Sequence, residues 1–351
     1  MKSVTMQTIA DNLGISRSLV SRALSDDYGV NPKTKSLIEH EAKKLGYTPL
    51  HFKKKNRAGI PSLLVLMPRY TLLDTMFGAK VLESIERLTK EASISLVLHL
   101  FNNHDNSINI PLLESNNNIM GVLILSLSKT SIREPLLTLL QKENIPVVLL
   151  DPLDQVNNYD IVMTDNYMGM YQLTEHVINK GHRRLLFVGH PHISTSFLNR
   201  YRGCADCVDR HPEVHCDYIL SYHETHPMNV DKFNEYILDW PNNQRTAIIC
   251  ANDPCAFLVY EKLTALGIRI PQDISVVGFD NVQKSINIHP ALTTVDISTD
   301  VIVKEALQLL QSRSGAADTQ ANHRLILVGA PIIERQSVRE IIEEETVSGE
   351  G

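Results

Sequence analysis

The segment TIADNLGISRSLVSRAL, residues 8 to 24, carries two arginines and several hydroxyl groups within a short stretch. At helical spacing, Arg17, Ser18 and Arg22 lie together on the polar side of a helix. A guanidinium is a planar fork that can donate hydrogen bonds to the O6 and N7 atoms of one guanine. These three residues are therefore candidates for reading base edges in duplex DNA.

Hydroxyl and amide side chains around the same helices form a second set of candidates. Such groups near helix N-termini suit contacts to DNA phosphates. They also cap helices, and the sequence leaves both roles open. The candidates for phosphate contact are Thr5, Ser16, Ser21, Ser25 and Asn31.

Further along the chain, polar residues follow apolar runs at the points where strands are expected to end. They are Asp151, His190, Asn252, Asp253 and Asp280. Ligands of open α/β folds bind at the carboxyl ends of parallel strands. Convergent polar groups of this kind suit a ligand that needs many directional hydrogen bonds. We interpret Asp253 as a helix cap and the others as candidates for ligand contact.

Three short helices are expected in the head of the chain. The first covers about residues 6 to 13 and Gly14 breaks it, Ser16 can cap the second, and Asn31 with Pro32 begins a third that ends at Gly46. Two helices joined by a short glycine-containing turn form a helix-turn-helix, although a small interaction domain would show the same pattern. The expected buried residues are Ile9, Ala10, Leu13, Leu19, Val20, Ala23, Leu24, Leu37, Ile38, Ala42 and Leu45.

The body alternates apolar strands with helical stretches, which predicts parallel sheets covered on both faces. Two successive series of strands indicate two α/β lobes, and each lobe receives one late strand. The expected strands are 62–68, 93–101, 121–128, 146–151, 160–165, 184–190, 218–223, 246–253, 275–280, 292–297 and 324–329.

The charge is distributed unevenly. Residues 1 to 60 hold 11 lysines and arginines against 5 acidic residues, whereas the whole chain of 351 residues has a net charge of −6. A basic head on an acidic body indicates that only the head meets a polyanion. An unevenly charged, solvated surface would give the same numbers.

No run of 18 apolar residues is present and MKSVTMQTIA lacks a signal-peptide core, so we expect a cytoplasmic protein with free thiols and no membrane partner. The segment CADCVDRHPEVHC, residues 204 to 216, superficially resembles zinc-site spacing. Two cysteines three apart also pack well on one helical face. We therefore interpret Cys204 and Cys207 as core residues and predict no metal site.

Motifs of common enzyme classes are missing: GxGxxG after a strand, a P-loop, GxSxG and HExxH. His182, between a helix and a strand, is interpreted as a structural turn residue. We predict neither a catalytic residue nor a cofactor.

Several segments, in order and spacing, match a known pattern. The head contains VTMQTIADNLGISRSLVSRALS and KLGYTP, and the body contains TDNYMGM, INKGHRRLLFVGH, RYRG, TAIICANDPCAFLVYEKLTALGIRIPQDISVVGFDN, HPALTTVD and PIIERQSV. The chain thereby resembles the LacI/GalR family of bacterial transcription regulators. The resemblance implies a DNA-binding head, a hinge and a two-lobed core like that of periplasmic sugar-binding proteins. It also implies a homodimer, or a tetramer, on a palindromic operator.

The resemblance also places a small-molecule effector between the lobes. It implies an effector-contacting arginine at Arg200, a polar partner at Asn252 and aspartates at Asp280 and Asp151. Ile297 stands where many relatives carry a glutamine. The implied effector is a sugar or sugar derivative, with a purine as the alternative. Further candidates are Ser196, His190 and, for the aromatic that stacks on the ligand, Phe77, Tyr222, His223 or His226.

The hinge departs from the family pattern. After YTP the family continues with an asparagine and later a leucine that wedges into the minor groove, whereas this chain has Leu50 and, in the wedge region, Lys53, Lys54, Lys55 and Asn56. Lysine and asparagine unstack bases poorly. The lysines are therefore candidates for phosphate contacts, with a flexible solvated linker as the alternative.

The predicted fold class is α/β, with a three-helix helix-turn-helix domain over 1–46, a hinge over 47–61, a two-lobed periplasmic-binding-protein-like core of parallel sheets over 62–338 and a flexible acidic tail over 339–351. Lobe 1 is expected over about 62–162 and 295–322, and lobe 2 over about 163–294 and 323–338. The predicted function is a nucleoid-associated repressor controlled by its effector. Whether the effector releases or promotes DNA binding stays open, and a sugar-binding or sugar-processing protein is the rival.

Overall fold

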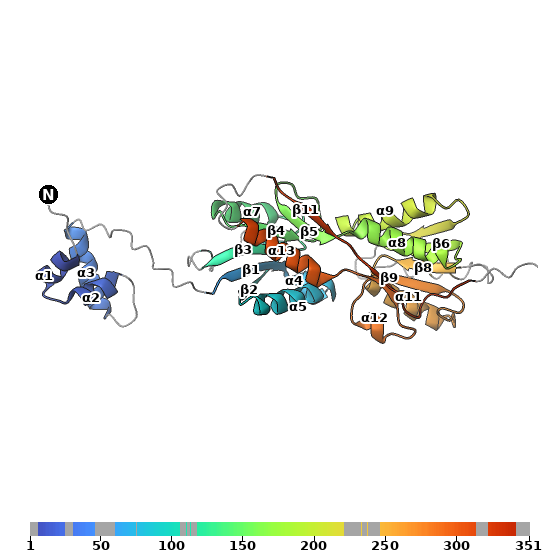
Figure 1. Cartoon of the computed structure of the whole chain (residues 1–351), viewed down its shortest axis with the longest axis horizontal. Helices are drawn as coiled ribbons and strands as arrows, with labels where there is room; N and C mark the ends of the chain where they lie inside the picture. Colours follow the sequence, from blue (N-terminus) through green and yellow to red (C-terminus); the bar gives the residue numbers. More distant parts are fainter. Residues whose placement is uncertain are drawn as a thin grey trace, which may run out of the picture. The chain divides into compact units, whose positions relative to one another are not determined.

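The computed structural model describes residues 6–24, 31–45, 60–74, 76–105, 110, 113, 118–220, 233, 237, 246–313 and 322–341. The chain divides into two compact units, Met1–Gly59 and Ile60–Gly351, whose elements are labelled in Figure 1. Among the described residues, no helix is long and apolar enough to cross a bilayer.

The first unit contains helices α1 (Met6–Leu13), α2 (Arg17–Leu24) and α3 (Pro32–Lys44), as the sequence predicts. Gly14 turns the chain between α1 and α2 at φ +65°, a conformation that favours glycine. The capping predictions are confirmed: Ser16 Oγ accepts a hydrogen bond from the Leu19 amide at 3.2 Å, and Asn31 Oδ1 accepts one from the Lys33 amide at 2.9 Å.

A small apolar core joins these three helices. Its buried members are Ile9, Ala10, Val20, Ala23, Ile38 and Ala42. The prediction that Leu37 is buried is wrong, because its side chain is 56% exposed. Leu37 precedes the buried Ile38 on α3, and one residue turns a helix by about 100°, which carries Leu37 off the core face.

The second unit contains two six-stranded sheets, one in each lobe. The lobe 1 sheet has the order β11-β5-β4-β3-β1-β2, and all its pairings are parallel. Its strands are β1 (Ser62–Pro68), β2 (Ser95–Phe101), β3 (Ile119–Leu125), β4 (Val147–Leu150), β5 (Asp160–Thr164) and β11 (Leu325–Val328). Its helices are α4 (Arg69–Asp74), α5 (Met76–Glu91), α7 (Arg133–Lys142) and α13 (Thr299–Arg313).

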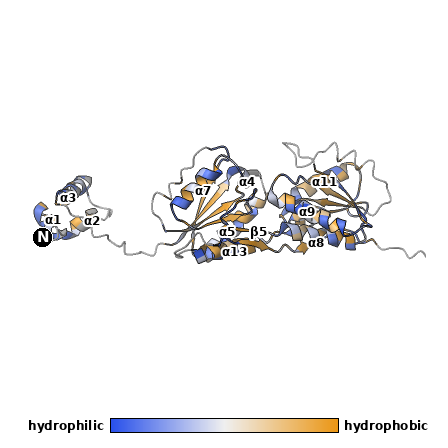
Figure 2. Cartoon of the chain, turned by 90° about the horizontal axis from the view of Figure 1, so that it is seen from above, coloured by the Kyte–Doolittle hydropathy of each residue, from blue (hydrophilic) through white to orange (hydrophobic). Residues whose placement is uncertain are grey.

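Both faces of the lobe 1 sheet are covered, as the continuous apolar strands predict. Leu63 and Val65 of β1 pack in one apolar cluster with residues of α5 and α13. The alternate residues Leu64 and Leu66 pack in a second cluster with α7. In Figure 2 the strands of this lobe are mostly orange, hence hydrophobic, whereas its helices alternate between orange and blue.

The lobe 2 sheet has the order β12-β10-β9-β8-β6-β7, and only the β10–β12 pairing is antiparallel. Its strands are β6 (Arg184–Val188), β7 (His215–Ile219), β8 (Thr246–Cys250), β9 (Ser275–Asp280), β10 (Thr293–Asp296) and β12 (Ile332–Ile333). Helices α8 (Asn166–Asn179) and α9 (Thr195–Asp209) cover one face, and α11 (Asp253–Ala265) covers the other. The short α12 (Lys284–Asn287) follows β9 (Figure 1).

The chain passes between the lobes three times: from β5 to α8, from β10 to α13 and from β11 to β12. The predicted assignment of 323–338 to lobe 2 is therefore wrong in its first part. Leu325 pairs with Ile161 and Val328 with Thr164, so β11 is an edge strand of lobe 1. The late strand pair itself was expected, one strand for each lobe.

The strand expected over 218–223 begins earlier, at His215. Its register with β6 starts at the pair Arg184 and His215 and ends at Val188 and Ile219. The first residues of β7 are polar or half-buried, so an apolar run does not mark where this strand starts. The interpretation of Cys204 and Cys207 as core residues is confirmed, because both are fully buried against the lobe 2 sheet.

Candidate functional site

Arg200 lies at the centre of a buried polar cluster in lobe 2. It projects from α9, whose N-cap residue Ser194 accepts a hydrogen bond from the Phe197 amide. Its Nε donates to Asn166 Oδ1 at 2.8 Å, and its Nη1 donates to the Ala251 carbonyl at 2.9 Å. Asn166 begins α8 and Ala251 follows β8, so three elements fix this side chain.

The third guanidinium nitrogen of Arg200 lies 2.9 Å from Asp280 Oδ1, at the end of β9. The guanidinium carbon also lies 3.9 Å from the centre of the Phe279 ring and 5.3 Å from that of Phe197. Stacking on an aromatic face fixes the plane of the guanidinium as well as its position. The cluster is therefore a rigid arrangement of one cation, one carboxyl group and two rings.

The carboxyl group of Asp280 is held in an unusual environment. Burial raises its pKa to about 7, although Arg200 acts in the opposite direction. Its backbone adopts φ +112°, a region that residues with a side chain seldom occupy. Backbone strain of this kind concentrates at functional sites.

Asp151, at the end of β4 in lobe 1, meets lobe 2 directly. Ser196 Oγ of α9 donates a hydrogen bond to Asp151 Oδ1 at 2.6 Å, and the Thr195 amide donates to the Leu153 carbonyl at 2.8 Å. Burial raises the pKa of Asp151, whereas the Ser196 hydrogen bond and Arg200 lower it. Asp151 has a positive φ of +43°, like Asp280. The structure thus brings Asp151, Ser196, Arg200 and Asp280 together at the carboxyl ends of strands from both lobes.

The remaining candidates of the body have other described partners. Asn252 follows β8 and caps α11, since its Oδ1 accepts a hydrogen bond from the Cys255 amide at 3.0 Å. The His190 ring lies 5.6 Å from that of His192. Phe77 of α5 packs against the apolar clusters of both lobes. Tyr222, His223 and His226 lie outside the described residues.

Asp253 serves the scaffold, although as a buried acceptor rather than as the predicted cap. Its carboxylate accepts hydrogen bonds from the Val282 amide, Ser285 Oγ and Thr294 Oγ1. These contacts tie α11 to the loop that follows β9 and to β10. His182, interpreted as structural, is fully buried, and its Nε2 lies 3.1 Å from the Arg339 carbonyl oxygen.

In the head, Arg17 and Ser18 are exposed on the first turn of α2. Ser16 and Asn31 are exposed and cap α2 and α3. Ser21 and Arg22 belong to α2, but the structure does not describe their side chains, and Thr5, Ser25, Lys53, Lys54 and Lys55 lie outside the described residues. In a helix-turn-helix, the residues at the start of the second helix contact the base edges, and Arg17 lies exposed at this position.

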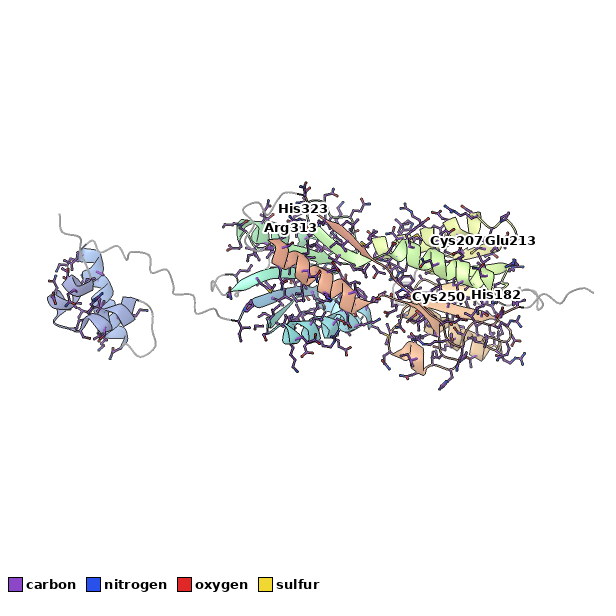
Figure 3. All side chains as sticks on the ribbon, in the orientation of Figure 1. His182, Cys207, Glu213, Cys250, Arg313 and His323 are labelled. Carbon is purple, nitrogen blue, oxygen red and sulfur yellow. The ribbon has the colours of Figure 1, made fainter. Side chains whose placement is uncertain are left out.

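A hollow of about 560 Å³ lies elsewhere, on lobe 1 between α7 and the segment before β5. Arg313 and His323 line it, and Figure 3 shows both at a distance from lobe 2. Asp160, at the start of β5, also lines it, whereas Asp151 and Asn166 follow the ends of strands. The hollow therefore lies at the amino ends of the strands, whereas the Arg200 cluster lies at their carboxyl ends.

Family models match both the head and the core of the chain. Residues 5–49 match the family model for bacterial regulatory proteins of the lacI family, and residues 174–338 match that of the periplasmic binding protein-like domain. Head and core together have the domain composition of the LacI family. The protein is a transcription regulator with a DNA-binding helix-turn-helix head and a two-lobed core.

Two helix-turn-helix transcription regulators match along nearly the whole chain. The transcriptional repressor PurR of Histophilus somni is 23% identical over 337 residues, which cover 95% of this chain and 99% of the relative. The transcriptional regulator CelR of Thermobifida fusca is 26% identical over 332 residues, covering 92% and 95%.

Solved structures of bacterial transcription regulators share the fold. A CelR–cellobiose complex has a TM-score of 0.61 at 22% identity, covering 95% of this chain and 99% of that one. A lac repressor dimer bound to operator and the anti-inducer ONPF also has a TM-score of 0.61, at 20% identity, covering 96% and 100%. A regulator from Enterococcus faecium with bound ribose has a TM-score of 0.64 at 20% identity, covering 80% and 100%.

Proposed function

We propose that this protein is a repressor whose operator binding is controlled by a small polar effector held between the lobes. The observation that carries the proposal is the hydrogen bond of 2.6 Å between Ser196 of lobe 2 and Asp151 of lobe 1, next to the Arg200–Asp280 pair. A ligand that contacts this cluster contacts both lobes. It therefore changes the balance between lobe arrangements by the difference in its affinity for each.

The chemistry of the cluster favours a polyhydroxyl effector. Asp151 and Asp280 can accept hydrogen bonds from hydroxyl groups, Arg200 and the amide of Asn252 can donate them, and Phe77 offers an apolar surface. Ser196 and His190 extend the polar lining. A sugar or sugar derivative fits this combination, and the ligands of the CelR and Enterococcus faecium structures, cellobiose and ribose, support it.

A purine is the second candidate effector. It is favoured by the match to PurR along 95% of this chain. A flat, nitrogen-rich ring would use the same acceptors and donors, and it would add stacking on an aromatic side chain.

For the head we propose base contacts by Arg17, Ser18 and Arg22. Phosphate contacts come from Thr5, Ser16, Ser21, Ser25 and Asn31, and from Lys53, Lys54 and Lys55 of the hinge. Two copies of the chain bind the two halves of a palindromic operator, since two-fold protein symmetry matches two-fold DNA symmetry. The protein acts in the cytoplasm, at the nucleoid.

Two measurements test the proposal. Fluorescence anisotropy with the DNA upstream of the protein's own gene should show saturable binding that a random duplex does not reproduce. A thermal-shift screen of sugars, phosphosugars and nucleobases should find a stabilising ligand, since a ligand at 100 times its Kd adds about 2.7 kcal/mol. Absence of DNA binding at low salt by dimeric protein would contradict the proposal.

A further inference from the structure

Lys80 of α5 reaches from lobe 1 into the loop that carries Asp280. Its Nζ donates hydrogen bonds to the carbonyl oxygens of Asp280 at 2.9 Å and Asn281 at 3.2 Å. It also lies 2.8 Å from Asp296 Oδ1, and about a quarter of each of these two side chains is exposed. The ammonium group of Lys80 thus donates hydrogen bonds to three acceptors of lobe 2.

The loop that Lys80 holds is strained. Asp280 and Asn281 are consecutive residues with positive φ, +112° and +50°, and neither is glycine. Such conformations persist only where surrounding contacts enforce them. Here the two carbonyl groups of the strained residues converge on one cation, and a charge-assisted hydrogen bond is stronger than a neutral one.

The other contacts of the loop come from lobe 2 itself. Asn281 Nδ2 donates to Asp296 Oδ1 at 3.0 Å, and Arg335 Nη2 donates to Asn281 Oδ1 at 2.6 Å. These contacts stay in place when the lobes separate, because all three residues belong to lobe 2. Among the described contacts of this loop, those from Lys80 come from lobe 1, so lobe separation breaks them. The chain returns to lobe 1 directly after Asp296, so this contact lies beside one of the three crossings.

We infer that Lys80 is a positioning residue of the effector site, which fixes the backbone of Asp280 from the opposite lobe. This inference rests on the proposed function, since it takes the Arg200–Asp280 cluster as the effector site. The direction of the Asp280 side chain follows from its backbone angles. Separation of the lobes removes the Lys80 ammonium from the two carbonyl groups, and the loop relaxes. The Asp280 carboxyl group that contacts the effector then changes its direction. Lobe arrangement and effector recognition are thereby coupled through one side chain.

The test compares Lys80→Met with Lys90→Met in the full chain, without ligand or DNA. Methionine keeps the length of the lysine side chain and removes its charge. Lys90 lies on the last turn of the same helix and is exposed. Hydrogen exchange of peptides covering residues 279 to 285 should become about tenfold faster in Lys80→Met, as expected when a charge-assisted hydrogen bond is lost. Lys90→Met should exchange like the wild type.

A distance measurement supplies the second readout. Spin labels on noncanonical residues at the exposed positions 142 in lobe 1 and 264 in lobe 2 report the separation of the lobes. Lys80→Met should broaden the distance distribution toward longer values, and Lys80→Arg, which keeps the cation, should restore a narrow one.

Unchanged exchange and an unchanged distribution in a folded Lys80→Met variant would overturn the inference. If Lys80→Met does not fold, Lys80→Arg must still preserve the wild-type exchange rates, and faster exchange by Lys90→Met would also count against it. The proposed function is tested separately by DNA binding of the wild type. A wild type that does not bind DNA would contradict the proposed function, but hydrogen exchange and the distance distribution would be unaffected.

Discussion

The guanidinium of Arg200 lies 2.9 Å from the carboxyl group of Asp280, and only 5% and 8% of these two side chains are exposed. A buried ion pair of this kind is weak support for stability, since each charge has lost its hydration. Removal of one partner alone is nevertheless costly, because the charge of the other partner stays buried. The pair therefore links the stability of lobe 2 to the chemistry of the proposed effector site.

Above pH 7, where Asp280 is ionised, Arg200→Met should destabilise the protein by up to about 3–5 kcal/mol, the usual cost of leaving one member of a buried ion pair alone. The double variant Arg200→Met with Asp280→Asn should recover part of this loss, and both variants should lose the thermal response to effector. Urea unfolding measures the stability. Arg202→Met, at an exposed position of the same helix, is the control. Equal losses in Arg202→Met and Arg200→Met would contradict the role given to the ion pair.

Asp280→Asn should change the pH dependence of stability. Burial raises the pKa of Asp280 from 3.8 to about 7 in the folded protein. The folded state therefore holds this proton more tightly than the unfolded chain, and the wild type loses stability as pH rises from about 4 to 7. Asparagine cannot ionise, so the stability of the variant relative to wild type should rise over this range, by up to about 4 kcal/mol at 1.36 kcal/mol per pKa unit. Thermal unfolding at pH 4 to 8 measures the trend.

Asp296→Asn supplies a control of opposite sign for this pH dependence. Burial alone would raise the pKa of Asp296, but the hydrogen bonds from Lys80 and Asn281 outweigh it, and the pKa is lowered. Asp296 therefore stabilises the fold above its unfolded pKa and loses this contribution as the pH falls. The stability of Asp296→Asn relative to wild type should fall with rising pH. Parallel trends in the two variants would show that the assigned causes are wrong.

Arg17→Ala should reduce discrimination between operator and mismatched DNA by about 1–3 kcal/mol, the usual contribution of one base-reading arginine. Lys44→Ala, at an exposed position on α3, should leave discrimination unchanged. Anisotropy titrations on both duplexes give the two affinities. An equal loss of affinity on both duplexes would make Arg17 a phosphate contact instead.

Replacement of Lys53, Lys54 and Lys55 by glutamine should lower the salt dependence of operator binding. Each phosphate contact contributes about 0.9 to the slope of log K against log salt, so the slope should become less steep by roughly 2 to 3. Titrations from 50 to 200 mM salt are suitable. An unchanged slope would identify the lysine run as a solvated linker.

Local patterns predicted most of the fold because local chemistry fixes it. Gly14, the caps at Ser16 and Asn31, and most of the apolar strands each act within a few residues and appear close to where they were expected. The assignment of β11 failed for the opposite reason. Its partner β5 lies about 160 residues earlier, and nothing in the local sequence selects a lobe.

Some residues of the site were predicted from the sequence and others were not. Asp151, Ser196, Arg200 and Asp280 come from recognisable strand ends and family motifs, and the structure brings them together. Asn166 stands in the motif TDNYMGM, yet its hydrogen bond to Arg200 was not foreseen. Lys80 and Asp296, 216 residues apart, carry no local signal, since their pairing depends on how two lobes meet.

The position of β11 also bears on how the protein is made. Lobe 1 begins at residue 62, but its sheet takes one edge strand from Leu325–Val328 and one of its covering helices from Thr299–Arg313. A ribosome translates the chain from the N-terminus, so most of lobe 2 leaves the exit tunnel before these pieces exist. The lobe that is synthesised first therefore stays incomplete until most of lobe 2 has been made, and nascent chains that stop short of residue 325 expose an unfinished sheet to chaperones.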